Sequence, residues 1–196
     1  MNRTIRKFNI IQRRLQLLSG PSGQKLHLGC GRMILPGFVN ADVVNLPGLD
    51  LVVDLEQKLP FKDNQFDLVY ARHTLEHIRN LNQLLSELHR ITKSTGLIEL
   101  ELPHCSCSTT FSDPTHKHFF TLHTFDYYTP GYDFDFYSSI RFQLVNKKVQ
   151  FTGGRFKFLN FLSWIVNLNG FTQNLWERFC WLLPMENLFF TLKPVK

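Results

Sequence analysis

Acidic residues are absent from the first 41 positions of this chain, although seven lysines and arginines lie there. All 16 acidic residues, and 15 of the 22 basic ones, occur from Asp42 onward. The net charge of +6 therefore belongs to the N-terminal segment. It gives no reason to expect that the rest of the chain binds a polyanion.

Cysteine is also scarce, and the four residues at positions 30, 105, 107 and 180 are not spaced as a disulfide framework. This favours a reducing cytoplasm over a secreted location. The longest apolar stretch, 158–171, contains asparagines and is shorter than the roughly 20 residues that span a bilayer. Basic residues interrupt the N-terminus, which argues against a secretory signal. We expect a soluble cytoplasmic protein whose contact with a membrane would be peripheral.

The composition predicts a globular protein, with 43% hydrophobic and 19% charged residues. A length of 196 residues corresponds to one domain. Residues 3–18 fit an amphipathic helix with basic residues around its polar side. This helix would pack on the domain with a solvated basic face, or contact an anionic membrane or a nucleic acid. We divide the chain into this helix, within residues 1–20, and one domain over residues 21–196.

Three candidate β-strands end on residues suited to hold parts of a nucleoside, and a fourth strand follows at residues 66–71. The three are residues 25–28 before Gly29-Cys30-Gly31, residues 37–41 before Asp42, and residues 49–53 before Asp54-Leu55. In an open α/β sheet, ligands bind beyond the carboxyl ends of the strands, where the strand order reverses. The sequence therefore predicts a nucleotide site at this edge.

Each residue type has a chemical reason to lie at such a strand end. The glycines at 29 and 31 allow a sharp turn and leave no Cβ between the backbone and a ligand. A carboxylate such as Asp42 can accept hydrogen bonds from both ribose hydroxyls. At Asp54-Leu55, the carboxylate can accept from an adenine amino group while a backbone N–H donates to a ring nitrogen.

These residues, with others up to about Pro103, resemble the class I S-adenosylmethionine-dependent methyltransferases, and among them the small type 11 methyltransferase domains. The resemblance rests on His27-Leu-Gly-Cys-Gly31, Pro36-Gly-Phe-Val-Asn-Ala-Asp42, Asp54-Leu55, Leu59-Pro-Phe61, Asp63-Asn-Gln-Phe-Asp-Leu-Val-Tyr70 and Leu75-Glu-His77. It implies a Rossmann-like three-layer α/β sandwich with a mostly parallel seven-stranded sheet and an antiparallel last strand. It also implies S-adenosyl-L-methionine as cofactor, bound by Gly29, Cys30, Gly31, Asp42, Asp54, Leu55, Arg72 and His73.

The chain departs from the family pattern in two ways. The family usually has an acid two places before the first glycine and a third glycine two places after the second, where this chain has His27 and Met33. Other groups must then hold the amino-acid end of the cofactor. The strand ends at Gly31, Asp42 and Asp54 also lie too close in sequence for full crossover helices, which need about a dozen residues or more. We expect the first two crossovers to be short turns.

Beyond the fourth strand, a helix with a leucine stripe is predicted to stop at residues 94–96, before a fifth strand at 97–102. Glu99 and Glu101 alternate with apolar residues in that strand, which predicts one wet face. Residues 141–151 and 187–195 are predicted as the closing antiparallel strands. Two insertions are expected: a loop region at 104–137, beyond the fifth strand, and an aromatic helical region at 155–185.

Methyl transfer to a hydroxyl requires a proton acceptor, and histidine suits this task near neutral pH. The insertion at 104–137 offers His104, Asp113 and His116 as candidate catalytic residues. In the leading interpretation, His116 is the general base or a ligand of the acceptor, and Asp113 orients it. In the alternative, Asp113 caps a helix that starts at Pro114, and the histidines serve packing and hydrogen bonding.

A zinc site is the competing chemistry, since Cys105-x-Cys107 and His116-x-His118 supply four possible zinc ligands. Pairs separated by one residue chelate one ion awkwardly, so we expect no metal there. Nucleic-acid amino methyltransferases of this class carry Asn or Asp followed by Pro-Pro and an aromatic residue after the fourth strand. This chain has Ala71-Arg72-His73-Thr74 instead, which disfavours a nucleic-acid acceptor.

The sequence therefore predicts an S-adenosylmethionine-dependent methyltransferase that acts on an oxygen or nitrogen of a small-molecule, glycan or lipid-linked acceptor. The aromatic region at 155–185 would suit an apolar or sugar-bearing acceptor, and a plain core or dimer face would explain it equally well. Two alternatives stay open: a catalytically silent S-adenosylmethionine-binding partner protein, and an RNA-associated methyltransferase. We expect a monomer or a homodimer.

Overall fold

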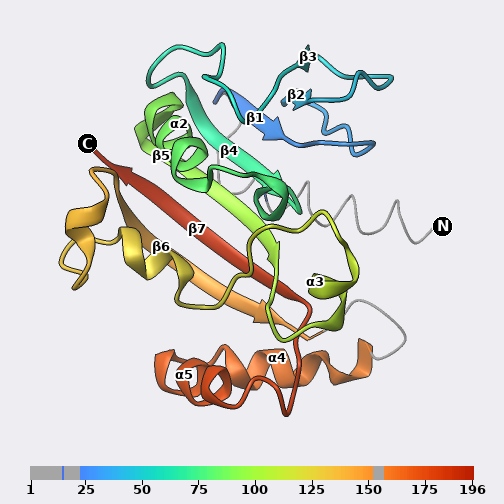
Figure 1. Ribbon diagram of the computed structural model, residues 1–196, viewed down its shortest axis with the longest axis vertical. Helices are drawn as coiled ribbons and strands as arrows, with labels where there is room; N and C mark the ends of the chain where they lie inside the picture. The colour runs from blue at the N-terminus through green and yellow to red at the C-terminus, as the bar shows by residue number, and fades with distance from the viewer. Residues whose placement is uncertain (1–14, 16–22, 152–156) are drawn as a thin grey trace.

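The fold is a seven-stranded sheet in a computed structural model that describes residues 15, 23–151 and 157–196 (Figure 1). The strands are β1 (Lys25–Leu28), β2 (Val39–Asp42), β3 (Leu51–Val52), β4 (Phe66–Arg72), β5 (Thr92–Pro103), β6 (Arg141–Gln150) and β7 (Asn187–Val195). Their spatial order is β3-β2-β1-β4-β5-β7-β6. β7 runs antiparallel to both of its neighbours, β5 and β6, and all other pairs are parallel, so the predicted sheet with an antiparallel last strand is confirmed.

The described helices are short, and α2 is the longest of them. They are α2 (Leu81–Ile91), α3 (Ser108–Ser112), α4 (Asn160–Val166) and α5 (Gly170–Arg178), with the 3₁₀ helices η1 (Leu75–His77), η2 (Thr124–Tyr128), η3 (Asp135–Tyr137) and η4 (Lys157–Leu159). The Asn80 side chain caps α2 by accepting from the Gln83 N–H. The leucine stripe of α2 is buried, as its periodicity predicts.

The stop of α2 comes earlier than residues 94–96, and that prediction is wrong. The helix ends at Ile91 because Thr92 is already extended and pairs with Phe66 of β4. Gly96 lies inside β5, where a Cβ would approach the Phe66 carbonyl oxygen to 2.9 Å. Ser94, Thr95 and Gly96, which the sequence suggested as a helix breaker, therefore permit close strand pairing.

The first two crossovers are turns rather than helices among the described residues, as the short spacing predicts. The Asn40 side chain holds the first turn, since its Oδ1 accepts from Leu35 N at 2.8 Å and its Nδ2 donates to the Leu35 carbonyl at 3.1 Å. Asp50 accepts from the Asn40 backbone N–H at 2.7 Å and so ties the second turn to the first. Side-chain hydrogen bonds replace the packing that helices would supply.

Two apolar clusters lie on opposite faces of the central strands. Alternate residues of β4 divide between them: Val69 packs in the cluster that contains the α2 leucines, and Leu68 packs in the other cluster. That second cluster contains Leu15, which is helical and buried. This agrees with the apolar side predicted for the N-terminal helix, and the rest of residues 3–18 lies outside the described residues.

The expected wet face of the fifth strand is wrong. Glu99 and Glu101 are only 2% and 3% exposed. Tyr70 donates to Glu101 Oε2 at 3.2 Å, and Arg72 Nε lies 3.1 Å from Glu101 Oε1. Because the protein itself supplies partners for the Glu101 carboxylate, alternation of polar residues in this strand does not indicate contact with water.

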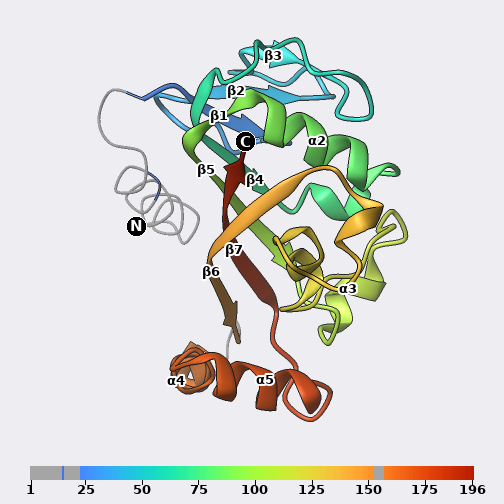
Figure 2. The same ribbon diagram turned by 90° about the vertical axis from the view of Figure 1, so that its left-hand side faces the viewer.

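The aromatic insertion forms a helical unit, as expected. Helices α4 and α5 lie together beyond the end of β6 and the start of β7, at the opposite end of the molecule from β3 (Figure 2). Several large apolar side chains of this unit face outward, and these include Trp164 of α4, Phe171 of α5 and Leu182, which follows α5. None of the helices in the described part of the chain has the length and apolar character needed to cross a membrane.

His27, which stands where the family pattern has an acid, leads to a prediction about how the stability of the protein depends on pH. His27 is buried and stacks on Tyr70, and burial lowers its pKa to about 4. Its pKa in the unfolded chain is about 6.5, so below that value the unfolded state binds more protons. The free energy of unfolding should therefore fall as the pH drops from about 6.5 to about 4.

The variant His27→Phe keeps an aromatic ring against Tyr70 and cannot titrate. Urea unfolding at about pH 7 and about pH 4 should show that the wild type loses up to about 3 kcal/mol more stability than the variant does. Equal losses in the two proteins would contradict a neutral, buried His27.

Candidate active site

The predicted nucleotide site lies where the strand order reverses, with β1 between β2 and β4. Gly29 and Gly31 both have positive φ, at 61° and 52°, which glycine adopts without strain. A Cβ on Gly29 would lie 2.3 Å from Thr74 Oγ1, whereas a Cβ on Gly31 would meet no atom within 4 Å. The turn is therefore pressed against Thr74, just after the end of β4, at Gly29, and it is open at Gly31.

Asp42 is placed at the open side of this turn. Its Oδ2 accepts from Gly31 N at 2.7 Å and its Oδ1 accepts from Val44 N at 3.1 Å. These two bonds fix the carboxylate at the end of β2 while lone pairs on both oxygens stay available. Asp54 is fixed in a similar way, because its Oδ1 accepts from Glu56 N at 2.9 Å.

Cys30 and Leu55 complete this edge as buried residues. Burial, with the Asp42 carboxylate close by, raises the pKa of the Cys30 thiol to about 11, so it is a protonated group that packs. The open space beside Gly31 and the ordered carboxylates of Asp42 and Asp54 fit a nucleoside. The ribose hydroxyls would be held by Asp42, and a base by Asp54 and Leu55.

Arg72 and His73, also predicted to bind the cofactor, follow the same edge but are held by Glu101. The Arg72 guanidinium pairs with its carboxylate, and His73 N donates to the Glu101 carbonyl at 2.8 Å. His73 takes a left-handed conformation with φ of 47°. The next residue, Thr74, donates to the Arg72 carbonyl at 3.0 Å and lies against Gly29. Residues 73–77 thus begin directly beside the glycine turn.

A pocket of about 250 Å³ opens beside this segment. Its lining residues are His73, Glu76, His77, Pro103, Thr109, Asp113, His116, Glu186 and Asn187. His116 is almost buried, with 9% of its side chain exposed. The pocket therefore unites two of the three predicted catalytic residues, His116 and Asp113, with a buried acid and two further histidines.

The Asp113 carboxylate lies near the His116 ring but too far away for a hydrogen bond. Its Oδ2 lies 3.8 Å from His116 Nε2, while its Oδ1 accepts from the Thr115 N–H at 2.9 Å and the Thr115 hydroxyl at 2.6 Å. These bonds hold the pKa of Asp113 below its usual value. No helix begins at Pro114, since 113–116 is a turn after α3, so the capping interpretation of Asp113 is wrong.

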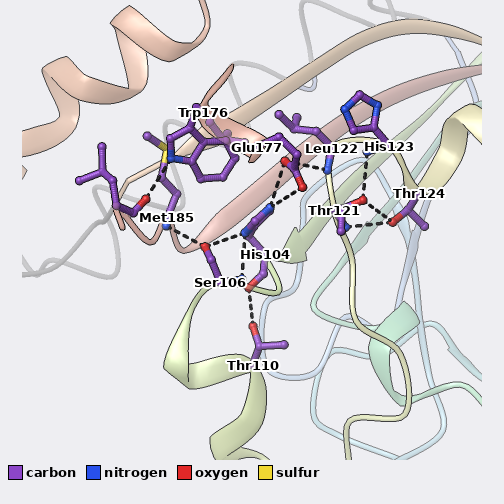
Figure 3. A network of polar contacts seen from close by, with 12 residues as sticks. His104, Ser106, Thr110, Thr121, Leu122, His123, Thr124, Trp176, Glu177 and Met185 are labelled. Carbon is purple, nitrogen blue, oxygen red and sulfur yellow. Dashed lines mark hydrogen bonds and ion pairs between the residues drawn. The ribbon is translucent and has the colours of Figure 1, made fainter. Parts of the chain in front are cut away.

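His104, the third predicted catalytic residue, is not among the lining residues of this pocket. Figure 3 shows its ring between Ser106 and Glu177. Its Nδ1 accepts from Ser106 N at 3.0 Å, and its Nε2 therefore carries the proton and lies 3.3 Å from Glu177 Oε2. The ring also packs against Trp176 and is fully buried, so His104 ties the end of β5 to α5.

The four residues weighed as zinc ligands are not brought together among the described residues, where the possible metal clusters are Glu76-His77-His116 and His104-Glu177-Cys180. Sequence reasoning missed Thr74, Glu76 and Glu101 as site residues. The signal for Glu76 was present in Leu75-Glu-His77, a motif noticed only as part of the resemblance. No pattern indicated that Thr74 would lie against Gly29.

Comparison with known proteins agrees with this geometry. A family model described as a methyltransferase domain matches residues 36–100. A demethylmenaquinone methyltransferase from Streptomyces avermitilis is 32% identical over 119 residues, which is 58% of this chain and 48% of that protein. A sterol 4-C-methyltransferase from Caenorhabditis elegans is 35% identical over 72 residues, 36% of this chain and 21% of that protein. The chain thus spans half or less of the length of these curated relatives.

Solved structures share the fold at low identity. A methyltransferase from Archaeoglobus fulgidus superposes with a TM-score of 0.57 at 17% identity, over 95% of this chain and 94% of that chain. The [4+2]-cyclase SpnF does so with a TM-score of 0.60 at 16% identity, over 97% and 82%. The strand order and these likenesses show the Rossmann-like fold of the class I methyltransferases. Residues 36–100 match a methyltransferase domain, and S-adenosylmethionine is the cofactor that the site at this sheet edge fits.

The two glycines of the turn allow a matched test of this site. Alanine at either position adopts an unfavourable positive φ, which costs roughly 1–2 kcal/mol. Gly29→Ala should cost more than Gly31→Ala in urea unfolding, because only its Cβ would meet Thr74. Gly31→Ala should instead weaken S-adenosylhomocysteine binding in calorimetry, since its methyl group enters the open side of the turn. Equal stability losses would contradict the placement of Thr74.

Proposed function

We propose that this protein is an S-adenosylmethionine-dependent methyltransferase whose acceptor binds in the histidine and carboxylate pocket around His116. The observation that supports this most is the position of residues 73–77. The Thr74 hydroxyl lies 3.5 Å from the carbonyl oxygen of Gly29, in the cofactor turn, and His73, Glu76 and His77 line the pocket. One short segment thus joins the cofactor edge to a polar cavity large enough for a reacting group.

The cofactor supplies a methyl group already activated by a sulfonium. The protein needs to align the acceptor, exclude water and provide partners for its polar atoms. His116 donates from Nδ1 to the Thr110 carbonyl at 2.7 Å. This leaves its Nε2 unprotonated, so Nε2 is available to accept a proton or a hydrogen bond from the substrate that receives the methyl group. Asp113 lies beside this nitrogen, so it favours a positive charge or a hydrogen-bond donor there.

The acceptor that this pocket fits is an oxygen or nitrogen of a small-molecule, glycan or lipid-linked compound. The polar lining provides hydrogen-bond partners for such a group, and the exposed aromatic side chains of α4 and α5 could contact an apolar portion. The names of two relatives, a demethylmenaquinone and a sterol methyltransferase, point to lipid-like small molecules in those proteins. The Arg72 side chain is paired with Glu101, and this position provides no aromatic ring on which a nucleobase of DNA or RNA would stack.

A cofactor-binding protein without methyl transfer is the second candidate. The neutral, buried His27 takes the place of the acid that the family pattern has before the glycine turn. SpnF, with a similar fold, is described as a cyclase, and a relative from Homo sapiens, 29% identical over 91 residues, is described as an arginine hydroxylase. Detection of S-adenosylhomocysteine after incubation with S-adenosylmethionine and a metabolite extract separates the two candidates, because only a methyltransferase forms it.

Asp42 tests the cofactor half of the proposal. Asp42→Asn removes the charge and one acceptor from the group assigned to the ribose hydroxyls, while its size is unchanged. The dissociation constant for S-adenosylhomocysteine, measured by calorimetry, should rise about 10- to 100-fold, as expected for lost hydrogen bonds to a charged group. Asp63→Asn, at an exposed carboxylate paired with Arg90, is the matched control and should leave the affinity unchanged. Unchanged affinity in Asp42→Asn would remove the ribose assignment.

His116 tests the acceptor half. His116→Gln should lower the extract-dependent formation of S-adenosylhomocysteine by about 100-fold or more, in the range typical of a proton-transfer or ligand group. Affinity for S-adenosylhomocysteine and the urea midpoint should stay close to wild type. His123→Gln, which removes an exposed histidine paired with Asp126, is the control. Joint loss of cofactor binding and folding would show that His116 is structural.

A further inference from the structure

Glu76 is a buried acid for which the proposed reaction assigns no task. It is fully buried and lines the pocket, yet neither carboxylate oxygen accepts a hydrogen bond from the described residues. The Nδ1 atom of His73 lies 3.3 Å from Oε1, without hydrogen-bonding geometry. A buried carboxylate with so few partners costs several kcal/mol unless a cation or donors compensate it.

Two histidines beside Glu76 are held in the tautomer that binds metal ions. The Thr115 hydroxyl donates to the ionised Asp113 carboxylate, so it must accept from His77 Nδ1–H at 2.8 Å. His116 Nδ1–H donates to the Thr110 carbonyl at 2.7 Å. Nε2 of both rings is therefore unprotonated. Metal-binding histidines commonly show this arrangement, in which the other ring nitrogen donates to a carbonyl, hydroxyl or carboxylate.

The three side chains are also held close together. One donor atom from each of Glu76, His77 and His116 lies within 4.8 Å of the others, and the two imidazole rings are 4.8 Å apart between centroids. The loop that carries His116 is tied to η1, because Lys117 N donates to the Glu76 carbonyl at 2.7 Å and the Lys117 ammonium donates to the His77 carbonyl. The site thus depends on fixed backbone rather than on mobile side chains.

We propose that Glu76, His77 and His116 bind one divalent transition-metal ion of the zinc type. Two imidazole nitrogens and a carboxylate suit zinc or iron better than magnesium or calcium, which prefer sets made of oxygen atoms. Three protein ligands leave coordination positions open, and these face the pocket with Asp113 beside them. In this arrangement His116 is a metal ligand and not the general base.

The consequence for the acceptor rests on the proposed function. An open coordination position takes a lone pair from oxygen or nitrogen, so the acceptor would be bound through the atom that is methylated or through one next to it. Binding of the ion itself does not depend on methyl transfer. The two proposals can therefore fail separately.

The second cluster, His104-Glu177-Cys180, does not fit a metal ion as well. His104 Nδ1 accepts from the Ser106 N–H, so its Nε2 carries a proton that points toward Glu177. Burial raises the pKa of Cys180, which keeps the thiol protonated. The His104 and Glu177 side chains of this second cluster already have hydrogen-bond partners in the protein, unlike the carboxylate oxygens of Glu76.

The experiment uses the full chain, treated with a chelator and dialysed, without a histidine tag. Calorimetric titration with Zn²⁺ should give one site per chain, and His77→Gln and Glu76→Gln should each weaken binding at least 10-fold, as is common when a ligand or its support is lost. Cys180→Ser and His123→Gln are controls that remove a thiol and an exposed histidine outside the cluster, and both should bind like wild type.

Substitution with Co²⁺ gives a readout of the ligands themselves. The visible absorption bands of the bound Co²⁺ should appear without a sulfur-to-cobalt charge-transfer band. The variant His77→Gln should change these absorption bands. Failure to bind Zn²⁺ in a folded wild type, or loss of binding in Cys180→Ser but not in His77→Gln, would overturn the proposal. If Glu76→Gln unfolds, His77→Gln, at a partly exposed residue, still decides the outcome.

Discussion

The contact between Thr74 and Gly29 is the constraint on which the arrangement of the site depends. A glycine with positive φ allows β1 to turn, and the absence of its Cβ allows the Thr74 side chain to occupy that space. The Thr74 hydroxyl donates to the Arg72 carbonyl and lies 3.4 Å from the Leu28 carbonyl oxygen, so the ends of β1 and β4 are joined at one point. The cofactor turn and the pocket therefore hold a fixed position relative to each other.

Buried carboxylates organise the other side of this edge. Glu101 gathers Tyr70 and Arg72 from β4, and its backbone carbonyl accepts from His73 N. That arrangement sets the left-handed turn at His73, which directs residues 74–77 across the strand ends. The Glu101 carboxylate is satisfied by protein donors, whereas the Glu76 carboxylate is not. This difference separates an acid that holds the fold from an acid that is available for a ligand.

Much of the fold could be predicted because each strand end carried its own local signal. Glycine turns, carboxylates after apolar runs and short spacing placed β1, β2 and β4 and excluded full crossover helices. Prediction failed where tertiary partners decide the outcome. Alternating Glu99 and Glu101 resemble a solvated strand face, and only the packing of β4 and β7 against β5 reveals that they are buried.

The candidate site divides in the same way. Gly29, Gly31, Asp42 and Asp54 could be placed from strand order alone, because parallel strands bring their ends to one edge. Histidines in a loop carry no such register. His104 and His116 are both candidate catalytic residues of the same loop region, yet one ties β5 to α5 and the other lines the pocket. The partners that distinguish them, Glu177 and Thr110, have no motif that marks them.

The family match covers residues 36–100, which include Asp42 and Asp54 but not the glycine turn at 29–31. The pocket takes His73, Glu76 and His77 from inside that range, and Asp113, His116 and Asn187 from outside it. This chain has shortened the crossovers around β2, on the cofactor side. The regions at 104–137 and 157–185 follow β5 and β6 and contain the short helices α3, α4 and α5. A relative that is similar only over the matched range therefore gives no information about Asp113, His116 or Asn187, so the acceptor has to be identified from these residues as well.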